Sequence, residues 1–236
     1  MRESKAYSAA DGFDVAPSEV LGLNGWFARR APAVQQMLLA GAQRRWFKKG
    51  APVYRVGDPA DGLHGLLSGS FEITVPGDDG VETLVHRADP GFWIGDLALF
   101  AEQPRLVSIT ATTPTETLFL PQPFLRRVID ENPALLRDFY DLTHENTALA
   151  LRLLSNLSVR QSERRLGLRL LHYSELSADD CGWLNMSQDH LASLVAVSLP
   201  TMQRILRRFA EEGLVQLSYR KLRVLDPDRL AALCRD

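Results

Sequence analysis

Hydrophobic positions follow a helical spacing near the start of the chain and change to a strand spacing soon afterwards. Between Val20 and Gln43 they fall three or four residues apart, with a break at Ala31-Pro32, which predicts short helices. From Arg44 to Pro121 short apolar segments alternate with glycine-containing turns about every 8–12 residues, a pattern typical of an all-β sandwich or barrel. We therefore predict a β-roll of about eight strands, preceded by short helices that cover a sheet.

A second helical pattern begins at Asn132-Pro133 and continues to about Leu157. Its apolar or seam-like positions fall at intervals of 4, 3, 4, 3, 4 and 4 residues, close to the a/d spacing of a two-stranded coiled coil, with one polar Asn that fixes register. The pattern predicts that this helix pairs with a second copy of the chain. The alternative is a single amphipathic helix that lies on its own β-roll. The predicted dimer seam comprises Leu135, Phe139, Leu142, Asn146, Leu149, Leu153 and Leu157.

The last third of the chain predicts a small helical domain that ends in a hairpin. A helix is expected from Ser162 to Tyr173. Two shorter helices follow between Ser187 and Phe209, and each opens at a serine, which is a good N-cap, with Pro200 in the first turn of the second. Apolar segments at Leu214–Leu217 and Leu222–Leu225 then flank a turn. This order predicts a helix-turn-helix followed by a wing.

The second short helix carries side chains suited to reading DNA. Its apolar face leaves an amide and several arginines on the opposite side. An arginine can bind guanine bidentately, a glutamine can do the same with adenine, and a helix N-terminus favours phosphate. The alternative is an ordinary helical hairpin with a solvated basic face. The candidate DNA contacts are Ser187, Gln188, Ser198, Leu199, Pro200, Thr201, Gln203, Arg204, Arg207, Arg208, Lys221 and Arg223.

Composition narrows the class of protein without changing this picture. The 236 residues are 45% hydrophobic and 24% charged, as in an ordinary globular protein. The net charge is −2, yet residues 159–236 hold 12 Lys+Arg against 10 Asp+Glu, and residues 1–158 hold 15 against 19. Cys181 and Cys234 are too few for a disulfide framework. Without a signal-peptide pattern or a run of about 18 apolar residues, a cytoplasmic protein with no membrane span is expected.

The residue sets of common catalytic sites are missing from the sequence. No Ser/His/Asp set, no cluster of metal ligands and no G-x-x-x-x-G-K-[ST] phosphate loop is visible. We therefore expect neither an enzyme nor a metal site.

The order of these parts resembles the Crp/Fnr family of bacterial transcription regulators, from about residue 20 to 230. The most specific segment is G-D-L-A-L-F at Gly95–Phe100 followed by Gln103-Pro104-Arg105, which resembles the family's phosphate-binding cassette for a cyclic nucleotide. The resemblance implies an α+β fold with a jelly-roll or β-roll sensor domain at residues 1–130, a dimerisation helix at 131–158 and a winged helix-turn-helix DNA-binding domain at 159–236. It also implies a homodimer, a pseudo-palindromic operator in double-stranded DNA, and contact with RNA polymerase.

The cassette departs from that of the family's cyclic-AMP binders. Asp96 stands where they have Glu, Arg105 matches their phosphate arginine if the loop is one residue shorter, and Leu106 replaces a Ser. Their two adenine-contacting positions on the long helix fall on Ala150 and Leu151. Each unpaired polar edge of a buried ligand costs about 1–3 kcal/mol, so cyclic AMP is not expected as the effector. The alternative for this cassette is that Asp96 and Arg105 pair with each other. The predicted effector pocket comprises Gly95, Asp96, Leu97, Arg105, Leu106, Asn146, Ala150 and Leu151.

Other effectors of the family find little support. An iron–sulfur cluster is usually held by cysteines near the N-terminus, and no Cys precedes Cys181, so this cofactor is excluded. Haem needs an axial His or Cys, but lone histidines such as His64, His86 and His144 are more often surface or core residues. The effector is therefore unknown and haem is not expected. The alternative function is a regulator that binds DNA without any small molecule, or that is controlled by another protein.

The reading helix also departs from the family pattern. Leu199 and Pro200 precede Thr201, so the family's guanine-reading arginine is missing at Leu199, which could touch a thymine methyl instead. Ala196 replaces the usual turn glycine and predicts a slightly different turn. We expect half-sites one helical turn apart, with a sequence unlike that of the cyclic-AMP-dependent relatives.

Overall fold

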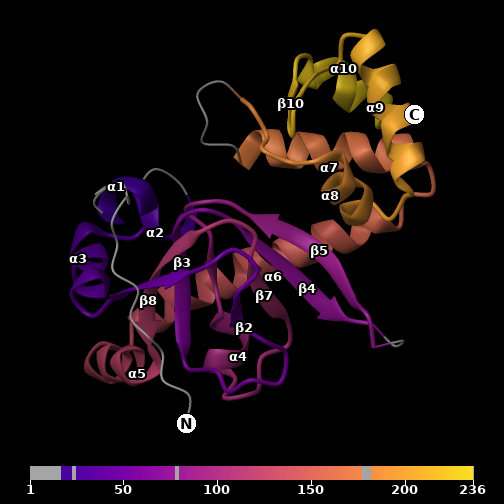
Figure 1. Ribbon diagram of the computed structural model, residues 1–236. Helices are drawn as coiled ribbons and strands as arrows, with labels where there is room; N and C mark the ends of the chain where they lie inside the picture. Colours follow the sequence, from indigo (N-terminus) through magenta and orange to yellow (C-terminus); the bar gives the residue numbers. More distant parts are fainter. Residues whose placement is uncertain (1–16, 23–24, 78–79, 177–181, 236) are drawn as a thin grey trace. The chain divides into compact units, whose positions relative to one another are not determined.

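The computed structural model describes residues 17–22, 25–77, 80–176 and 182–235 (Figure 1). The chain forms two compact units, residues 1–83 with 87–146 and residues 84–86 with 147–236. Helix α6 (Leu135–Leu157) belongs to the first unit up to Asn146 and to the second from Thr147 onwards. The predicted α+β class is confirmed, since a β-roll precedes this long helix and a helical C-terminal part follows it.

Two four-stranded sheets build the β-roll of the first unit, in the orders β1-β8-β3-β6 and β2-β7-β4-β5. The strand β3 pairs antiparallel with β8 on one side and with β6 on the other. Eight strands are described in this region, as the glycine-punctuated pattern predicts. Their bounds are β1 Gln43–Phe47, β2 Pro52–Tyr54, β3 Gly62–Ser68, β4 Phe71–Pro76, β5 Glu82–Ala88, β6 Trp93–Ile94, β7 Ser108–Ala111 and β8 Thr115–Pro121.

An aromatic layer joins the helices of the first unit to its sheet. Trp93 of β6 has its ring 5.4 Å from that of Trp26 and 5.8 Å from that of Phe27, and Phe139 of α6 lies 5.8 Å from Trp26. The indole nitrogen of Trp26 also donates to the carbonyl oxygen of Asp138 at 2.6 Å. Burying aromatic rings of this size removes a large apolar area from water. The helices are α1 (Pro17–Leu21), α2 (Gly25–Ala28), α3 (Pro32–Ala40), α4 (Asp96–Phe100) and α5 (Gln122–Glu131).

The first half of α6 lies on its own β-roll, and this corrects the predicted dimer seam. Leu135, Phe139 and Leu142 are each only 2% exposed and belong to the core of the first unit, so they are not available to a partner helix. The alternative of an amphipathic helix that covers its own roll therefore holds for this half. Of the large hydrophobic residues exposed on α6, Leu157 is a predicted seam position, whereas Leu136, Tyr140, Leu151 and Leu154 lie at other positions.

The second unit is a helical domain with a two-stranded hairpin, as the sequence predicts. Its core collects the inner side of α9, which buries Met202, Ile205, Leu206 and Phe209. Residues 177–181, which follow the expected helix from Ser162 to Tyr173 and include Cys181, lie outside the described residues. The elements are α7 (Ser162–Leu176), α8 (Gln188–Leu194), α9 (Leu199–Glu211), β9 (Val215–Ser218), β10 (Lys221–Val224) and α10 (Pro227–Leu233).

The turn between α8 and α9 contains an alanine in the left-handed region. Ala196 has φ 51°, the conformation that a glycine would adopt without strain, so the turn keeps its shape although the residue type differs. Its neighbours support the geometry, because the amide of Val197 donates to the carbonyl of Ala192 at 3.0 Å.

Replacing Ala196 with glycine is expected to raise the free energy of unfolding by about 0.5–1 kcal/mol, because the strain of the left-handed Cβ disappears. Denaturant unfolding of the purified protein measures this change. The matched control is Ala192→Gly inside α8, where glycine should instead lower the stability. An Ala196→Gly protein less stable than the parent would contradict the assignment of strain to this turn.

Candidate DNA interface and sensor site

Serine caps begin both helices of the helix-turn-helix, as predicted. The hydroxyl of Ser187 accepts from the amide of His190 at 3.2 Å, and that of Ser198 accepts from the amide of Thr201 at 3.4 Å. The hydroxyl of Thr201 lies 2.9 Å from that of Ser198, so its side chain is partly engaged by the cap. Pro200 occupies the first turn, where its missing N–H leaves no intrahelical bond unmade.

The face of α9 opposite its buried residues is polar and basic. Gln203, Arg204 and Arg207 are exposed there, and Leu199 and Pro200 are exposed at its N-terminal end. Within the described part of the chain, neither Arg204 nor Arg207 has an ion-pair partner. Their guanidinium groups are thus available to an external anion or base edge, which is the chemistry that major-groove reading uses.

Arg208 differs from the other predicted DNA-contacting arginines of this helix. Its Nη1 lies 2.8 Å from a carboxylate oxygen of Glu163 in α7, and its Nε lies 2.8 Å from Glu212 at the end of α9. The hydrogen bond to Glu212 and the charge of Glu163 raise the pKa of the guanidinium. Two carboxylates therefore pair with Arg208, whose side chain is still 51% exposed, so a DNA phosphate would have to compete with them and the DNA contact of Arg208 stays a prediction.

Sequence reasoning missed Arg165, which anchors the turn of the helix-turn-helix. Its Nε donates to the carbonyl of Val195 at 2.6 Å and its Nη1 to that of Val159 at 2.7 Å. A longer bond of 3.4 Å reaches Ala196. These carbonyls follow helices and lack intrahelical partners, so Arg165 satisfies them. No local sequence signal identifies such a residue, because two of its three acceptors, the carbonyls of Val195 and Ala196, lie 30 and 31 residues further along the chain.

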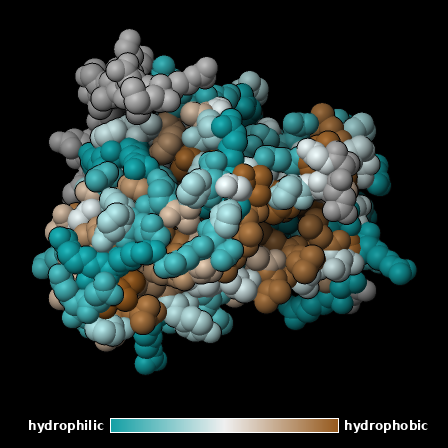
Figure 2. Space-filling model, turned by 90° about the horizontal axis from the view of Figure 1, so that it is seen from below, coloured by the Kyte–Doolittle hydropathy of each residue, from teal (hydrophilic) through white to brown (hydrophobic). Residues whose placement is uncertain are grey.

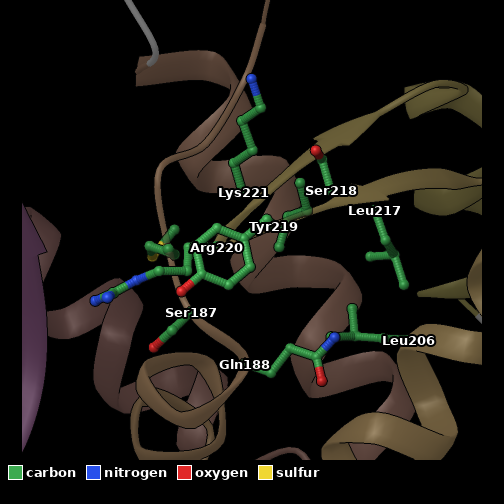
Figure 3. Close-up of a pocket in the computed structure, with 10 residues that line it drawn as sticks. Ser187, Gln188, Leu206, Leu217, Ser218, Tyr219, Arg220 and Lys221 are labelled. Carbon is green, nitrogen blue, oxygen red and sulfur yellow. The ribbon is translucent and has the colours of Figure 1, made fainter.

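A pocket of about 290 Å³ lies between the start of α8, α9 and the wing (Figure 3). Ser187 and Gln188 line one part of it, Leu206 contributes from α9, and the turn of the wing closes it. Figure 3 shows the side chains of Arg220 and Lys221 extending away from the pocket in different directions. The predicted contact residues Ser187, Gln188 and Lys221 therefore share one surface of the second unit.

The cassette of the first unit encloses its arginine. Arg105 is 2% exposed, its Nη1 donates to the carbonyl of Gly95 at 2.8 Å, and its Nη2 donates to the carbonyl of Gly62 at 2.8 Å. Its ion-pair partner is Asp61 at 2.9 Å, and its guanidinium carbon lies 4.2 Å from the ring centroid of Tyr54. The alternative that Arg105 pairs with Asp96 is therefore wrong.

Gly95 is required where the strand β6 meets α4. Its φ is 107°, and a Cβ there would lie 2.6 Å from Nη1 of Arg105 and 2.8 Å from the carbonyl oxygen of Gly62. Glycine thus allows the backbone to approach the guanidinium closely. The tight turn and the buried arginine form one packed unit.

Asp96 and Asn146 form the second polar contact of the cassette. The Asn146 amide donates to Asp96 Oδ1 at 2.7 Å and to the carbonyl of Trp93 at 3.1 Å. Burial raises the pKa of the Asp96 carboxyl, and the Asn146 hydrogen bond opposes this rise. The other oxygen, Oδ2, is buried with no hydrogen-bond partner in the described structure. Asn146 therefore bonds to residues of its own β-roll, and its places in the predicted effector pocket and in the predicted dimer seam stay predictions.

The other residues of the predicted effector pocket do not join this group. The side chains of Leu97 and Leu106 are 52% and 57% exposed. Ala150 and Leu151 are exposed on the part of α6 that belongs to the second unit. The structure thus brings together four of the predicted residues. Arg105 bonds to Gly95, Asn146 bonds to Asp96, and Gly95 and Asp96 are neighbours in the chain.

The histidines considered for haem lie in different surroundings. His64 is enclosed by the rings of Phe47, Tyr54 and Phe119, and burial lowers its pKa to about 3, so it is neutral near pH 7. His144 is exposed on α6. Across the described residues no group of three or more His, Cys, Asp or Glu could hold a metal ion, and none of the helices has the length and hydropathy to cross a membrane.

Two family profiles match the sequence, one for each of these sites. The profile described as cyclic nucleotide-binding domain matches residues 44–132, and that described as Crp-like helix-turn-helix domain matches residues 164–233. The first range contains the Arg105 cassette and the second contains the recognition helix α9. The profiles therefore agree with the division of chemistry between the two units.

Named relatives and solved structures extend this similarity to most of the chain. The CRP-like cAMP-activated global transcriptional regulator of Mycobacterium tuberculosis is 26% identical over 222 residues, which cover 92% of this chain and 99% of that protein. The cyclic AMP receptor protein of Thermus thermophilus is 29% identical over 195 residues, 79% of this chain and 86% of that protein.

Among solved structures, FixK2 from Bradyrhizobium japonicum matches with a TM-score of 0.74 at 18% identity, over 81% of this chain and 96% of that one, and supports the fold. A CRP/FNR-family transcriptional regulator from Thermus thermophilus matches with a TM-score of 0.63 at 25% identity, over 82% and 99%. With both profiles in sequence order and relatives aligned along almost its whole length, the chain belongs to the Crp/Fnr family of transcription regulators.

Proposed function

We propose that this regulator works as a homodimer that binds a pseudo-palindromic operator in double-stranded DNA, in the cytoplasm, and contacts RNA polymerase there. The observation that carries the proposal is the outer face of α9, where Gln203, Arg204 and Arg207 are exposed opposite a fully buried apolar side. Gln203 and Arg204 would read base edges, and Arg207 would meet phosphate. Leu199, exposed at the first turn, would touch a thymine methyl.

A second copy of the chain is the proposed partner of α6. Hydrophobic side chains interrupt the hydrophilic surface in patches (Figure 2). Several of the large hydrophobic residues exposed in the chain belong to α6. Leu136, Tyr140, Leu151 and Leu154 are 52–68% exposed, and their spacing, continued through Thr147, keeps them on one side of the helix. This stripe replaces the first half of the predicted seam and supports a helix-to-helix dimer contact. Of the remaining predicted seam positions, Leu157 is also exposed, whereas Leu153 is buried.

We further propose that cyclic AMP does not control this protein, although the names of two relatives describe cyclic-AMP proteins. Both terminal nitrogens of Arg105 already bind Asp61 and two backbone carbonyls, so a phosphate would have to compete with these bonds. Leu106, Ala150 and Leu151 offer no side-chain hydrogen bond to a nucleotide. The same enclosed arginine supports the alternative, a regulator that binds DNA without an effector or under the control of another protein.

The variant Arg204→Ala is expected to lower affinity for the operator by about 5- to 150-fold, because a bidentate base contact is worth about 1–3 kcal/mol. Operator fragments selected from random DNA and fluorescence anisotropy provide the measurement. Arg208→Ala is the matched control on the same helix, and it should change operator affinity much less because Glu163 and Glu212 hold that side chain. Full operator affinity in the Arg204→Ala protein would refute the role given to Arg204.

Placing two carboxylates in the exposed stripe, as in Leu151→Glu with Leu154→Glu, is expected to convert the dimer to a monomer, because like charges would face each other across the seam. Sedimentation equilibrium measures the mass directly. Arg152→Glu is the control, since Arg152 is also exposed but lies on another side of α6. A double variant that stays dimeric would show that the partner binds elsewhere.

Cyclic AMP is expected to bind this protein at least about 30-fold more weakly than it would bind a site that makes all of the family's contacts. At least two of those contacts are absent here, and each is worth about 1–3 kcal/mol. Calorimetry gives the binding constant, and anisotropy with operator DNA shows whether the nucleotide alters DNA affinity. In the variant Ala150→Thr with Leu151→Ser, two hydroxyl groups return and tighter nucleotide binding is expected. Micromolar binding by the unaltered protein, with a gain in DNA affinity, would reject this part of the proposal.

A further inference from the structure

Trp183 lies beside the wing because an isolated β-bridge joins its neighbour Leu184 to Leu222 of β10. The amide of Leu184 donates to the carbonyl of Leu222 at 2.7 Å, and the amide of Leu222 donates back at 3.0 Å. Both leucines are buried in the core of the second unit. Side chains alternate between the two faces of extended chain, so the neighbours of these leucines point to the other face. Trp183 therefore shares that outer face with Lys221 and Arg223.

The two wing cations lie over the indole ring of Trp183. The ammonium nitrogen of Lys221 is 4.6 Å from the ring centroid, and the guanidinium carbon of Arg223 is 5.1 Å from it. Both distances fall within the range in which a ring quadrupole attracts a cation, about 6 Å. Arg223 is fixed further by its cross-strand neighbour, because its Nε donates to the side-chain oxygen of Gln216 at 2.7 Å.

We infer that Trp183 is a positioning residue for the contact between the wing and the phosphodiester backbone of double-stranded DNA. The inference rests on the proposed function and adds a residue to its binding surface. Lys and Arg side chains have many rotamers, and a cation that is ordered before binding loses less entropy when it meets a phosphate. The indole ring thus prepares Lys221 and Arg223 for the backbone while taking no part in reading the sequence.

Contact with the ring does not use the groups that a phosphate needs. An ammonium has three N–H donors, and a guanidinium over an aromatic face still donates in its own plane. The bond from Nε of Arg223 to Gln216 leaves the two terminal nitrogens for a bidentate phosphate contact. Lys221 and Arg223 can therefore contact the Trp183 ring and a DNA phosphate at the same time. The ring does not compete with the phosphate for these cations.

The test compares Trp183→Ala, Trp183→Leu and Trp183→Phe in the full-length protein. Affinity for the operator and for an unrelated duplex is measured by anisotropy at several salt concentrations. Trp183→Ala and Trp183→Leu are expected to weaken both affinities by the same factor, about 3- to 10-fold, and to flatten the salt dependence, since the cations meet phosphates less well. Trp183→Phe, which keeps an aromatic face, should retain most of the affinity. Trp183→Leu keeps the apolar volume, so it separates the ring's attraction for cations from simple packing.

The decisive comparison repeats Trp183→Ala in a protein that already carries Lys221→Ala and Arg223→Ala. If Trp183 acts through these cations, its substitution has no further effect in that background. An equal loss of affinity with and without the cations would overturn the inference, and so would unchanged affinity for both duplexes in Trp183→Ala and Trp183→Leu. Absence of any DNA binding by the unaltered protein would instead overturn the proposed function itself, so the two failures are distinguishable.

Discussion

The burial of one side of α6 in the β-roll determines much of what the other residues can do. Phe139 packs against Trp26, and Leu135 and Leu142 complete the same core. A helix is rigid, so burying one face sets its rotational orientation and determines which residues point outward. It sets Asn146 beside Asp96 at the edge of the cassette, and it leaves a different stripe of apolar side chains exposed. The sensor and the proposed dimer contact thus depend on the same packing of one helix face.

The protein satisfies this cassette only in part, since Nε of Arg105 and Oδ2 of Asp96 are buried without a hydrogen-bond partner in the described structure. The carboxylate of Asp61 and two backbone carbonyls take the terminal nitrogens of Arg105, and the Asn146 amide takes one oxygen of Asp96. A buried charge without partners would be strongly destabilising, and here the partners come from the chain itself. A phosphate at Arg105 would have to compete with these three bonds for the two terminal nitrogens.

The sequence predicts the elements well because their signals are local. Serine caps mark the starts of α8 and α9, glycine and apolar alternation mark the strands, and the spacing of apolar residues marks the helices. The seam was misplaced because both the buried and the exposed stripes of α6 repeat at three- and four-residue intervals, and spacing alone cannot tell them apart. The partner of Arg105 could not be predicted because Asp61 lies 44 residues earlier in the chain.

Some arginines of the second unit bond to groups of their own domain, and others are exposed and available to bind DNA. The overall charge of the domain therefore says little about DNA binding. Arg165 satisfies carbonyls at the turn, Arg208 is paired with two carboxylates, and Arg204 and Arg207 remain exposed. A surface potential arises from the last group, since paired charges largely cancel. A count of basic residues does not distinguish the paired arginines from the exposed ones. The division depends in part on contacts between residues far apart in the sequence, namely Arg165 with Val195 and Arg208 with Glu163. A domain of nearly balanced charge can therefore still present an unbalanced face to a duplex.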